Sequence, residues 1–122
     1  MTSLVIEATA WLLYFEAILR RKPFHVLHEA VRCQPIRTTS DRSATEMNHA
    51  MDIACAIYFR RVLCLQRSAA TTVLLRRHGL AAEMVVGVRL LPFKSHAWVE
   101  VAGSVVNDKP YIGALYRVLE RC

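Results

Sequence analysis

The spacing of apolar residues predicts a long helix at the start of the chain. Between residues 3 and 21 apolar side chains recur every three or four positions, which is the period of one helix face. These positions are Leu4, Ala8, Trp11, Leu12, Phe15, Ile18 and Leu19. Basic residues stand at the end of the helix and Pro23 stops it. The next segment, residues 22–40, carries two prolines, and we predict connecting chain with one helical turn around residues 26–31.

Two more helices are predicted before the period changes. Ser40 is a suitable N-cap for a helix over roughly residues 43–60. Its inward face is expected to hold Met47, Met51, Ala54, Cys55 and Tyr58. A third helix, about residues 64–78, is bounded by Gly79 as its C-cap. Cys64 therefore lies where one helix ends and the next begins.

The C-terminal part of the chain has the pattern of β-structure. Residues 82–90 are apolar and β-branched, and residues 97–101 alternate between the two classes. Residues 104–106 follow a tight turn at Gly103, which predicts a hairpin. We predict a short closing helix over residues 112–120. Helices followed by an antiparallel sheet make an α+β fold.

Length and composition predict one domain over residues 1–122 with some apolar surface to spare. Apolar residues make up 54% of the chain, which indicates a core and an apolar patch kept for a partner. The net charge of +6 fits an acidic partner, a membrane surface or nucleic acid. Paired arginines near helix C-termini also complement the helix dipole. The most apolar stretch, residues 4–19, contains Glu7 and Glu16 and is shorter than the ~20 residues that span a bilayer, so we expect no membrane segment.

Cysteine usage and motif content limit the cellular compartment and the cofactors. The four cysteines have no C-x-x-C spacing and no secretory signal is visible, which favours a reducing cytoplasm without disulfides. His25 and His28 form a His-x-x-His pair, but no third ligand stands at a suitable spacing, so no metal site is predicted. With no phosphate-binding or dinucleotide-binding glycine pattern, no cofactor is expected.

Three residues in separate predicted elements have the chemistry of a cysteine hydrolase. A thiol attacks a carbonyl as the thiolate, and the positive end of a helix starting at Cys64 favours an anion. His96 opens a predicted strand and is a candidate general base. Asp108 lies beyond the turn that follows this strand, so it can return beside His96 and orient the imidazole. We predict that Cys64 is the nucleophile, His96 the base and Asp108 the orienting residue.

These residues stand in motifs that resemble a known family. The motifs are Cys64-Leu-Gln-Arg-Ser with the helix end Leu-Leu-Arg-Arg-His-Gly79, Val86-Gly-Val88, His96-Ala-Trp-Val-Glu100, and Gly103-Ser-Val-Val-Asn-Asp108. Together they resemble the lasso-peptide leader peptidases, the transglutaminase-like B proteins of lasso-peptide biosynthesis. The resemblance covers roughly residues 45–110 and implies a papain/transglutaminase-like fold. The family's Cys-His-Asp triad falls on the three residues predicted above.

The resemblance also implies a substrate and partners. Such proteins remove the leader from a ribosomally made precursor peptide and so free the amine that a separate cyclase uses. Many are fused behind a small leader-recognition domain. Because nothing precedes the first helix here, the chain resembles the split form, whose recognition domain is a separate protein. The surplus apolar surface would then be the docking site for that protein, and the cyclase is a further candidate partner.

Neighbouring residues have supporting roles or structural ones. Trp98 lies on the same strand face as His96, where it either shields the His96–Asp108 contact from water or packs in the core. Glu100 shares that face and either pairs with an arginine or lines the site. Asn107 is the alternative orienting residue, because an asparagine has this role in papain-like enzymes.

The oxyanion donors are only partly assigned by the sequence. The backbone N–H of Cys64 at the helix start is the natural first donor. Gln66 and Arg67 are chemically able to be the second, although a structural or solvent-facing role fits each as well. Arg67 and Ser68 belong to the recognised motif without a role of their own.

Two other functions remain open as alternatives. The same triad would serve a transglutaminase-like acyltransferase, which passes the acyl group to an amine instead of water. A non-catalytic basic interaction module would explain the charge. Nucleic acid is not an expected partner, since the chain lacks the interleaved aromatic and basic residues of an RNA-binding sheet and a recognition helix.

Overall fold

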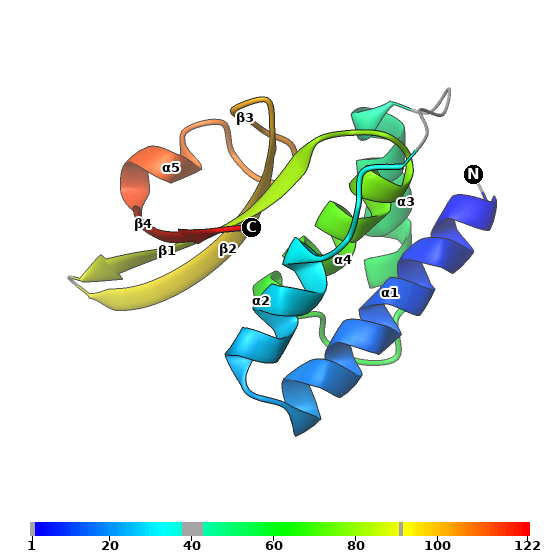
Figure 1. The fold of residues 1–122 in the computed structure, drawn as a ribbon, viewed down its shortest axis with the longest axis horizontal. Coiled ribbons are helices and arrows are strands. Elements are labelled where there is room, and N and C mark those ends of the chain that lie inside the picture. Colours follow the sequence, from blue (N-terminus) through cyan, green and yellow to red (C-terminus); the bar gives the residue numbers. More distant parts are fainter. Residues whose placement is uncertain (1, 38–42, 91) are drawn as a thin grey trace.

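The computed structural model describes residues 2–37, 43–90 and 92–122, and their helices and strands follow the α+β order expected from the sequence. The elements are α1 (Thr2–Arg21), α2 (Phe24–Arg32), α3 (Ala44–Ile57), α4 (Cys64–Arg77), β1 (Ala82–Leu90), β2 (Phe93–Val101), β3 (Ser104–Val105), α5 (Ile112–Leu115) and β4 (Arg117–Arg121). Helices α1 to α4 gather on one side of the sheet, and α5 lies apart from them near β4 (Figure 1). The α+β prediction is therefore confirmed.

The sheet is antiparallel throughout, with strand order β3-β2-β1-β4. The long strands β1 and β2 pair along their whole lengths, whereas β3 pairs only with Glu100 and Val101. The tight turn between β2 and β3 places Gly103 at φ +81°, a conformation that glycine adopts without strain. Beyond Val99, whose carbonyl accepts the N–H of Val106, no described strand pairs with the outer edge of β2 toward Phe93. That edge becomes one wall of the candidate site.

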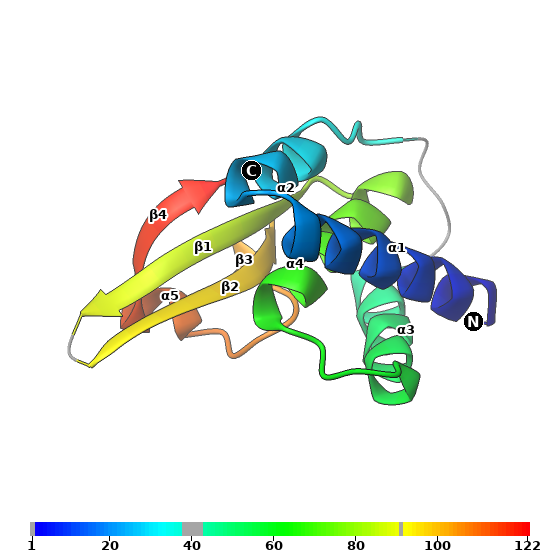
Figure 2. The same cartoon turned by 90° about the horizontal axis from the view of Figure 1, so that it is seen from below.

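Alternation along the strands gives the sheet two different faces. Met84 and Val99 point into the helical core, whereas Val85 and Trp98 point to the opposite face. Ile112 of α5 packs on that opposite face and completes a smaller cluster. Seen from below, β1 and β2 run between α5 and the larger helices (Figure 2).

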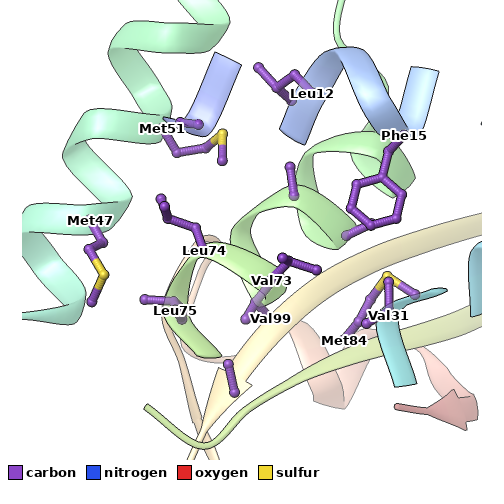
Figure 3. Close-up of a cluster of buried hydrophobic side chains, with 14 of the residues drawn as sticks. Leu12, Phe15, Val31, Met47, Met51, Val73, Leu74, Leu75, Met84 and Val99 are labelled. Atoms are coloured by element: carbon purple, nitrogen blue, oxygen red, sulfur yellow. The ribbon is translucent and has the colours of Figure 1, made fainter. Parts of the chain in front are cut away.

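The helical core is built around α4. Eight consecutive residues of this helix, from Ser68 to Leu75, are fully buried or nearly so, because α1, α3 and the sheet all pack against it. The cluster in Figure 3 joins these elements through Leu12, Phe15, Val31, Met47, Met51, Val73, Leu74, Leu75, Met84 and Val99. The face predicted for α3 is correct at Met47, Met51 and Ala54, whereas Cys55 and Tyr58 lie half-buried at its border. The predicted cap Ser40 lies outside the described residues, and the side chain of Ser43 accepts a hydrogen bond from the N–H of Glu46.

Two segments differ from the sequence prediction. Residues Phe24–Arg32 form a complete helix, α2, where we expected connecting chain with a single turn. Five of its nine residues are apolar, and two of them, Leu27 and Val31, are fully buried. The predicted closing helix over 112–120 is wrong beyond Leu115, because the chain extends and adds β4 to the edge of β1.

Helix α1 is long and apolar enough, by length and composition alone, to cross a membrane. One of its faces belongs to the protein core, however, since Leu4, Ala8, Leu12 and Phe15 are buried there. This packing agrees with the expectation that α1 is an amphipathic helix of the domain.

Candidate active site

Cys64 is exposed at the first position of α4. Gln66 fixes this helix start, because its Oε1 accepts the N–H of Leu63 at 3.4 Å and its Nε2 donates to the carbonyl of Leu12 at 2.9 Å. Gln66 is 2% exposed, so the second bond is a buried link between α1 and α4. The side chain is thus committed to holding the helix start in place and is not directed at a substrate.

His96 lies on β2 and is hydrogen-bonded to Asp108, which follows β3. The distance between His96 Nε2 and Asp108 Oδ2 is 2.5 Å, and the other carboxylate oxygen accepts the backbone N–H of Lys109 at 2.7 Å. Burial alone would raise the pKa of Asp108, but the hydrogen bonds from His96 and Lys109 and their charges outweigh it, so this pKa is below its usual value. Asp108 is therefore held as a carboxylate against the imidazole.

The three predicted catalytic residues line one pocket of about 370 Å³. Its walls are Arg61, Val62, Cys64, Arg67 and Ser68 on one side, and His96, Ala97, Asn107 and Asp108 on the other. Since Nε2 of His96 is bonded to Asp108, Nδ1 is the ring nitrogen left to exchange a proton with a group in the pocket. The structure therefore brings Cys64, His96 and Asp108 together.

Aromatic rings support the imidazole of His96 from the side facing away from the helices. The His96 ring centroid is 6.1 Å from that of Trp98 and 5.5 Å from that of Tyr116. Trp98 is fully buried, so it packs in the small cluster and also stacks on the imidazole. Tyr116 was not foreseen, because it follows α5 and meets His96 only through the fold.

Gly87 makes room for these rings. It stands directly opposite His96 in the β1–β2 ladder. A Cβ at this position would lie 2.9 Å from Tyr116 Cβ, 3.0 Å from the Trp98 ring and 3.1 Å from the carbonyl oxygen of Arg117. The glycine of the Val-Gly-Val motif is therefore required by a close approach of side chains.

Glu100 pairs with an arginine, which was one of the two roles expected for it. Its carboxylate accepts hydrogen bonds from Trp98 Nε1 and from Arg121 Nη1, each at 2.9 Å. Burial raises the pKa of Glu100, but these two donors bring it below its usual value. Glu100 thus anchors Trp98, on which His96 stacks, and joins β2 to β4.

Asn107 is bonded to the β2 backbone and not to His96. Its Oδ1 accepts the N–H of Val99 at 2.8 Å and its Nδ2 lies 3.5 Å from Ser68 Oγ. This geometry favours Asp108 over Asn107 as the orienting residue. It also gives Ser68 a role, since the hydroxyl ties α4 to the segment that carries Asp108.

Arg67, the other motif residue without a predicted role, forms an ion pair with Asp52 of α3. This pair leaves Arg67 on the wall of the pocket but engaged with a neighbour. In the part of the chain that the structure describes, no group of three or more His, Cys, Asp or Glu side chains could hold a metal ion. His28 of the His-x-x-His pair instead lies 2.9 Å from a carboxylate oxygen of Glu120.

Comparisons with known proteins identify the family of the chain. The family model of the transglutaminase-like superfamily matches residues 9–121. Microcin J25-processing protein McjB of Escherichia coli is 49% identical to the chain over 47 residues, a stretch that covers 38% of the chain and 23% of that relative. No solved structure gives a significant match. The resemblance recognised in the sequence and the expected transglutaminase-like fold are thereby confirmed, and the chain belongs to the transglutaminase-like superfamily.

Proposed function

We propose that this protein is a cysteine peptidase that removes the leader from a lasso precursor peptide. The observation that carries the proposal is the shared pocket of Cys64, His96 and Asp108, with the His96–Asp108 hydrogen bond of 2.5 Å. Similarity to a microcin-processing protein supports the kind of substrate. The matched stretch covers only 23% of that relative, so the similarity does not show the substrate and partners of this chain, and both are proposed.

The proposed reaction has two chemical steps. First, His96 takes the proton of Cys64, and the sulfur attacks the carbonyl carbon of the scissile peptide bond. The C–N bond then breaks as His96 returns the proton to the leaving amine, which leaves a thioester on Cys64. In the second step His96 deprotonates a water molecule, the hydroxide attacks the thioester, and the C–S bond breaks as His96 returns the proton to the sulfur of Cys64. Asp108 stabilises the imidazolium formed in each step.

The oxyanion of each tetrahedral intermediate requires hydrogen-bond donors. The N–H of Cys64 belongs to the first turn of α4, whose N–H groups have no acceptor within the helix. We therefore retain it as the first donor. Gln66 does not fit the second role, since it donates to the carbonyl of Leu12. Arg67 lines the pocket and is paired with Asp52 through one Nη, so it stays the candidate for the second donor.

A separate leader-recognition protein is proposed to deliver the substrate. What supports it is an apolar hollow of about 410 Å³ on α1 and the end of α3. It is lined by Val5, Ile6, Thr9, Ala10, Leu13 and Ile57. Ile6 and Ile57 are each 66% exposed, which is unusual for isoleucine without a partner.

The proposal is tested with purified protein and a lasso precursor peptide, with and without its leader-recognition protein. Mass spectrometry should show one cut at the leader–core junction, which is lost in Cys64→Ala and enhanced by the recognition protein. A folded protein that cuts no precursor in either mixture would refute the peptidase.

The alternative reaction, acyl transfer, is separated in the same experiment. An added amine would become part of the leader product if the acyl group were transferred, whereas hydrolysis adds the mass of water. This control is necessary because the pocket is open to an added amine and because the superfamily is named after transglutaminases.

A further inference from the structure

A second pocket lies next to the candidate active site. It has a volume of about 540 Å³. Its lining residues are Glu16, Leu19, Arg20, Arg60, Arg61, Leu63 and Gln66. Arg61 lines both pockets, and Leu63 immediately precedes Cys64. An extended peptide whose carbonyl reaches Cys64 would therefore place a neighbouring side chain in or beside this second pocket.

Two of the arginines in this pocket already have a carboxylate. Glu16 lies 3.6 Å from the Nε of Arg20 and 3.8 Å from the Nε of Arg60, and it also accepts a hydrogen bond from Tyr58 at 3.0 Å. The guanidinium of Arg60 also stands 5.4 Å from the ring centroid of Phe59. Their positive charge is thus partly balanced within the protein.

Arg61 differs from these residues. It is exposed, and it forms no ion pair and no side-chain hydrogen bond with the residues in the described ranges. Arg67, the other arginine of the catalytic pocket, is paired with Asp52. Arg61 therefore lies at the border of the two pockets with no carboxylate of the described residues within ion-pair distance.

A guanidinium in this position is suited to one kind of ligand. Its planar fork binds a carboxylate through two parallel hydrogen bonds. The leucines of the pocket, Leu19 and Leu63, would contact the aliphatic part of such a side chain. Charge and shape together therefore favour an acidic residue.

We propose that Arg61 is a specificity-determining residue that binds the carboxylate of an Asp or Glu side chain near the scissile bond of the peptide substrate. This inference rests on the proposed peptidase function and adds the chemical class of a residue that the site selects. Arg61 acts on substrate choice and takes no part in the proton transfers of Cys64 and His96.

The test measures kcat/KM for precursor peptides in which residues flanking the cut are replaced one at a time by Glu, Gln or Lys. The wild type, Arg61→Gln and Arg61→Glu are compared with Arg117→Gln, which removes the same charge from an exposed residue of β4 at the opposite edge of the sheet. At one position near the cut, the wild type should prefer Glu over Gln about fivefold. Arg61→Gln should lose this preference, Arg61→Glu should prefer Lys, and Arg117→Gln should behave as the wild type.

A binding assay separates this inference from the peptidase proposal. The same peptides, labelled with a fluorophore, are titrated with Cys64→Ala and with the double variant Cys64→Ala/Arg61→Gln. Weaker binding of the Glu peptide to the double variant, with unchanged binding of the Gln peptide, would support Arg61 even if no peptide were cleaved. Equal charge preference with and without Arg61, or an equal loss in Arg117→Gln, would overturn the inference, once thermal unfolding shows that each variant is folded.

Discussion

Replacement of Gly87 by alanine should destabilise the protein through three close contacts. The new Cβ would lie 2.9–3.1 Å from Tyr116 Cβ, the Trp98 ring and the Arg117 carbonyl oxygen. Carbon atoms in favourable contact are about 3.5–4.0 Å apart, so these groups must move by about 0.5 Å or more. Arg117 begins β4, which is paired with β1, and Tyr116 directly precedes it. The third group, the Trp98 ring, is fully buried.

The magnitude follows from two opposing effects. Overpacking of a filled site costs about 1–3 kcal/mol. The alanine also restricts the unfolded chain, which offsets about 0.4–1 kcal/mol of that cost. We therefore expect Gly87→Ala to lower the free energy of unfolding by about 1–2 kcal/mol, and to lower Tm by about 5–10 °C.

Urea denaturation followed by circular dichroism measures this change, and Gly113→Ala is the matched control. No atom lies within 4 Å of a Cβ at Gly113, which is in α5, so its replacement should be neutral or stabilise by up to about 1 kcal/mol. If Gly87→Ala unfolded at the same urea concentration as the wild type, the steric reasoning would be refuted. An equal loss in both variants would refute it as well.

Four further outcomes follow from the site and its supports. Asp108→Asn should lower kcat for precursor cleavage by about 10²- to 10⁴-fold with little loss of fold, because the imidazolium of His96 loses its carboxylate; a rate near wild type would exclude Asp108 from the reaction. Glu100→Gln should lower the free energy of unfolding by about 1–3 kcal/mol at neutral pH. Because folding lowers the pKa of Glu100, the carboxylate stabilises the protein above the ordinary carboxyl range, and this stabilisation is lost as pH falls through the lowered pKa. The difference between variant and wild type in urea denaturation should therefore disappear in acid. Gln66→Ala should cost a similar amount, about 1–3 kcal/mol, because the buried carbonyl of α1 loses its donor, and a neutral result by the same assay would contradict the link between the helices. Burial raises the pKa of Cys122 to about 11, so mass spectrometry should find this thiol the slowest to react with iodoacetamide at pH 8, and rapid labelling would contradict its burial.

The catalytic candidates could be found in the sequence because their signals are local. The helix start at Cys64, the strand that carries His96 and the turn before Asp108 are each indicated by a few neighbouring residues, although β2 begins at Phe93 and not at His96 as predicted. The resemblance to a known family then joined the three residues into one triad. The supports of the site are different, since Tyr116 and Gly87 meet His96 only through the register of three strands. No pattern within one segment specifies that register.

The predictions for α2 and β4 are wrong for separate physical reasons. In α2 the apolar stripe is short, and the flanking prolines Pro23 and Pro35 made the segment resemble connecting chain. In β4 every residue is exposed, so alternation carries no signal, and the strand exists because β1 offers an unpaired edge. Tertiary pairing of this kind overrides local preference.

The two halves of the triad are supported by different parts of the core, which gives them unequal protection. Cys64 begins a helix that is embedded in the large core, whereas His96, the partner of Asp108, stacks on Trp98 of the small cluster. Partial opening of the C-terminal segment around that small cluster requires less free energy than global unfolding. Such an opening would separate base from nucleophile while the helical layer stayed folded, so amide exchange in α5 and β4, more than the melting temperature, should follow the fraction of molecules able to react.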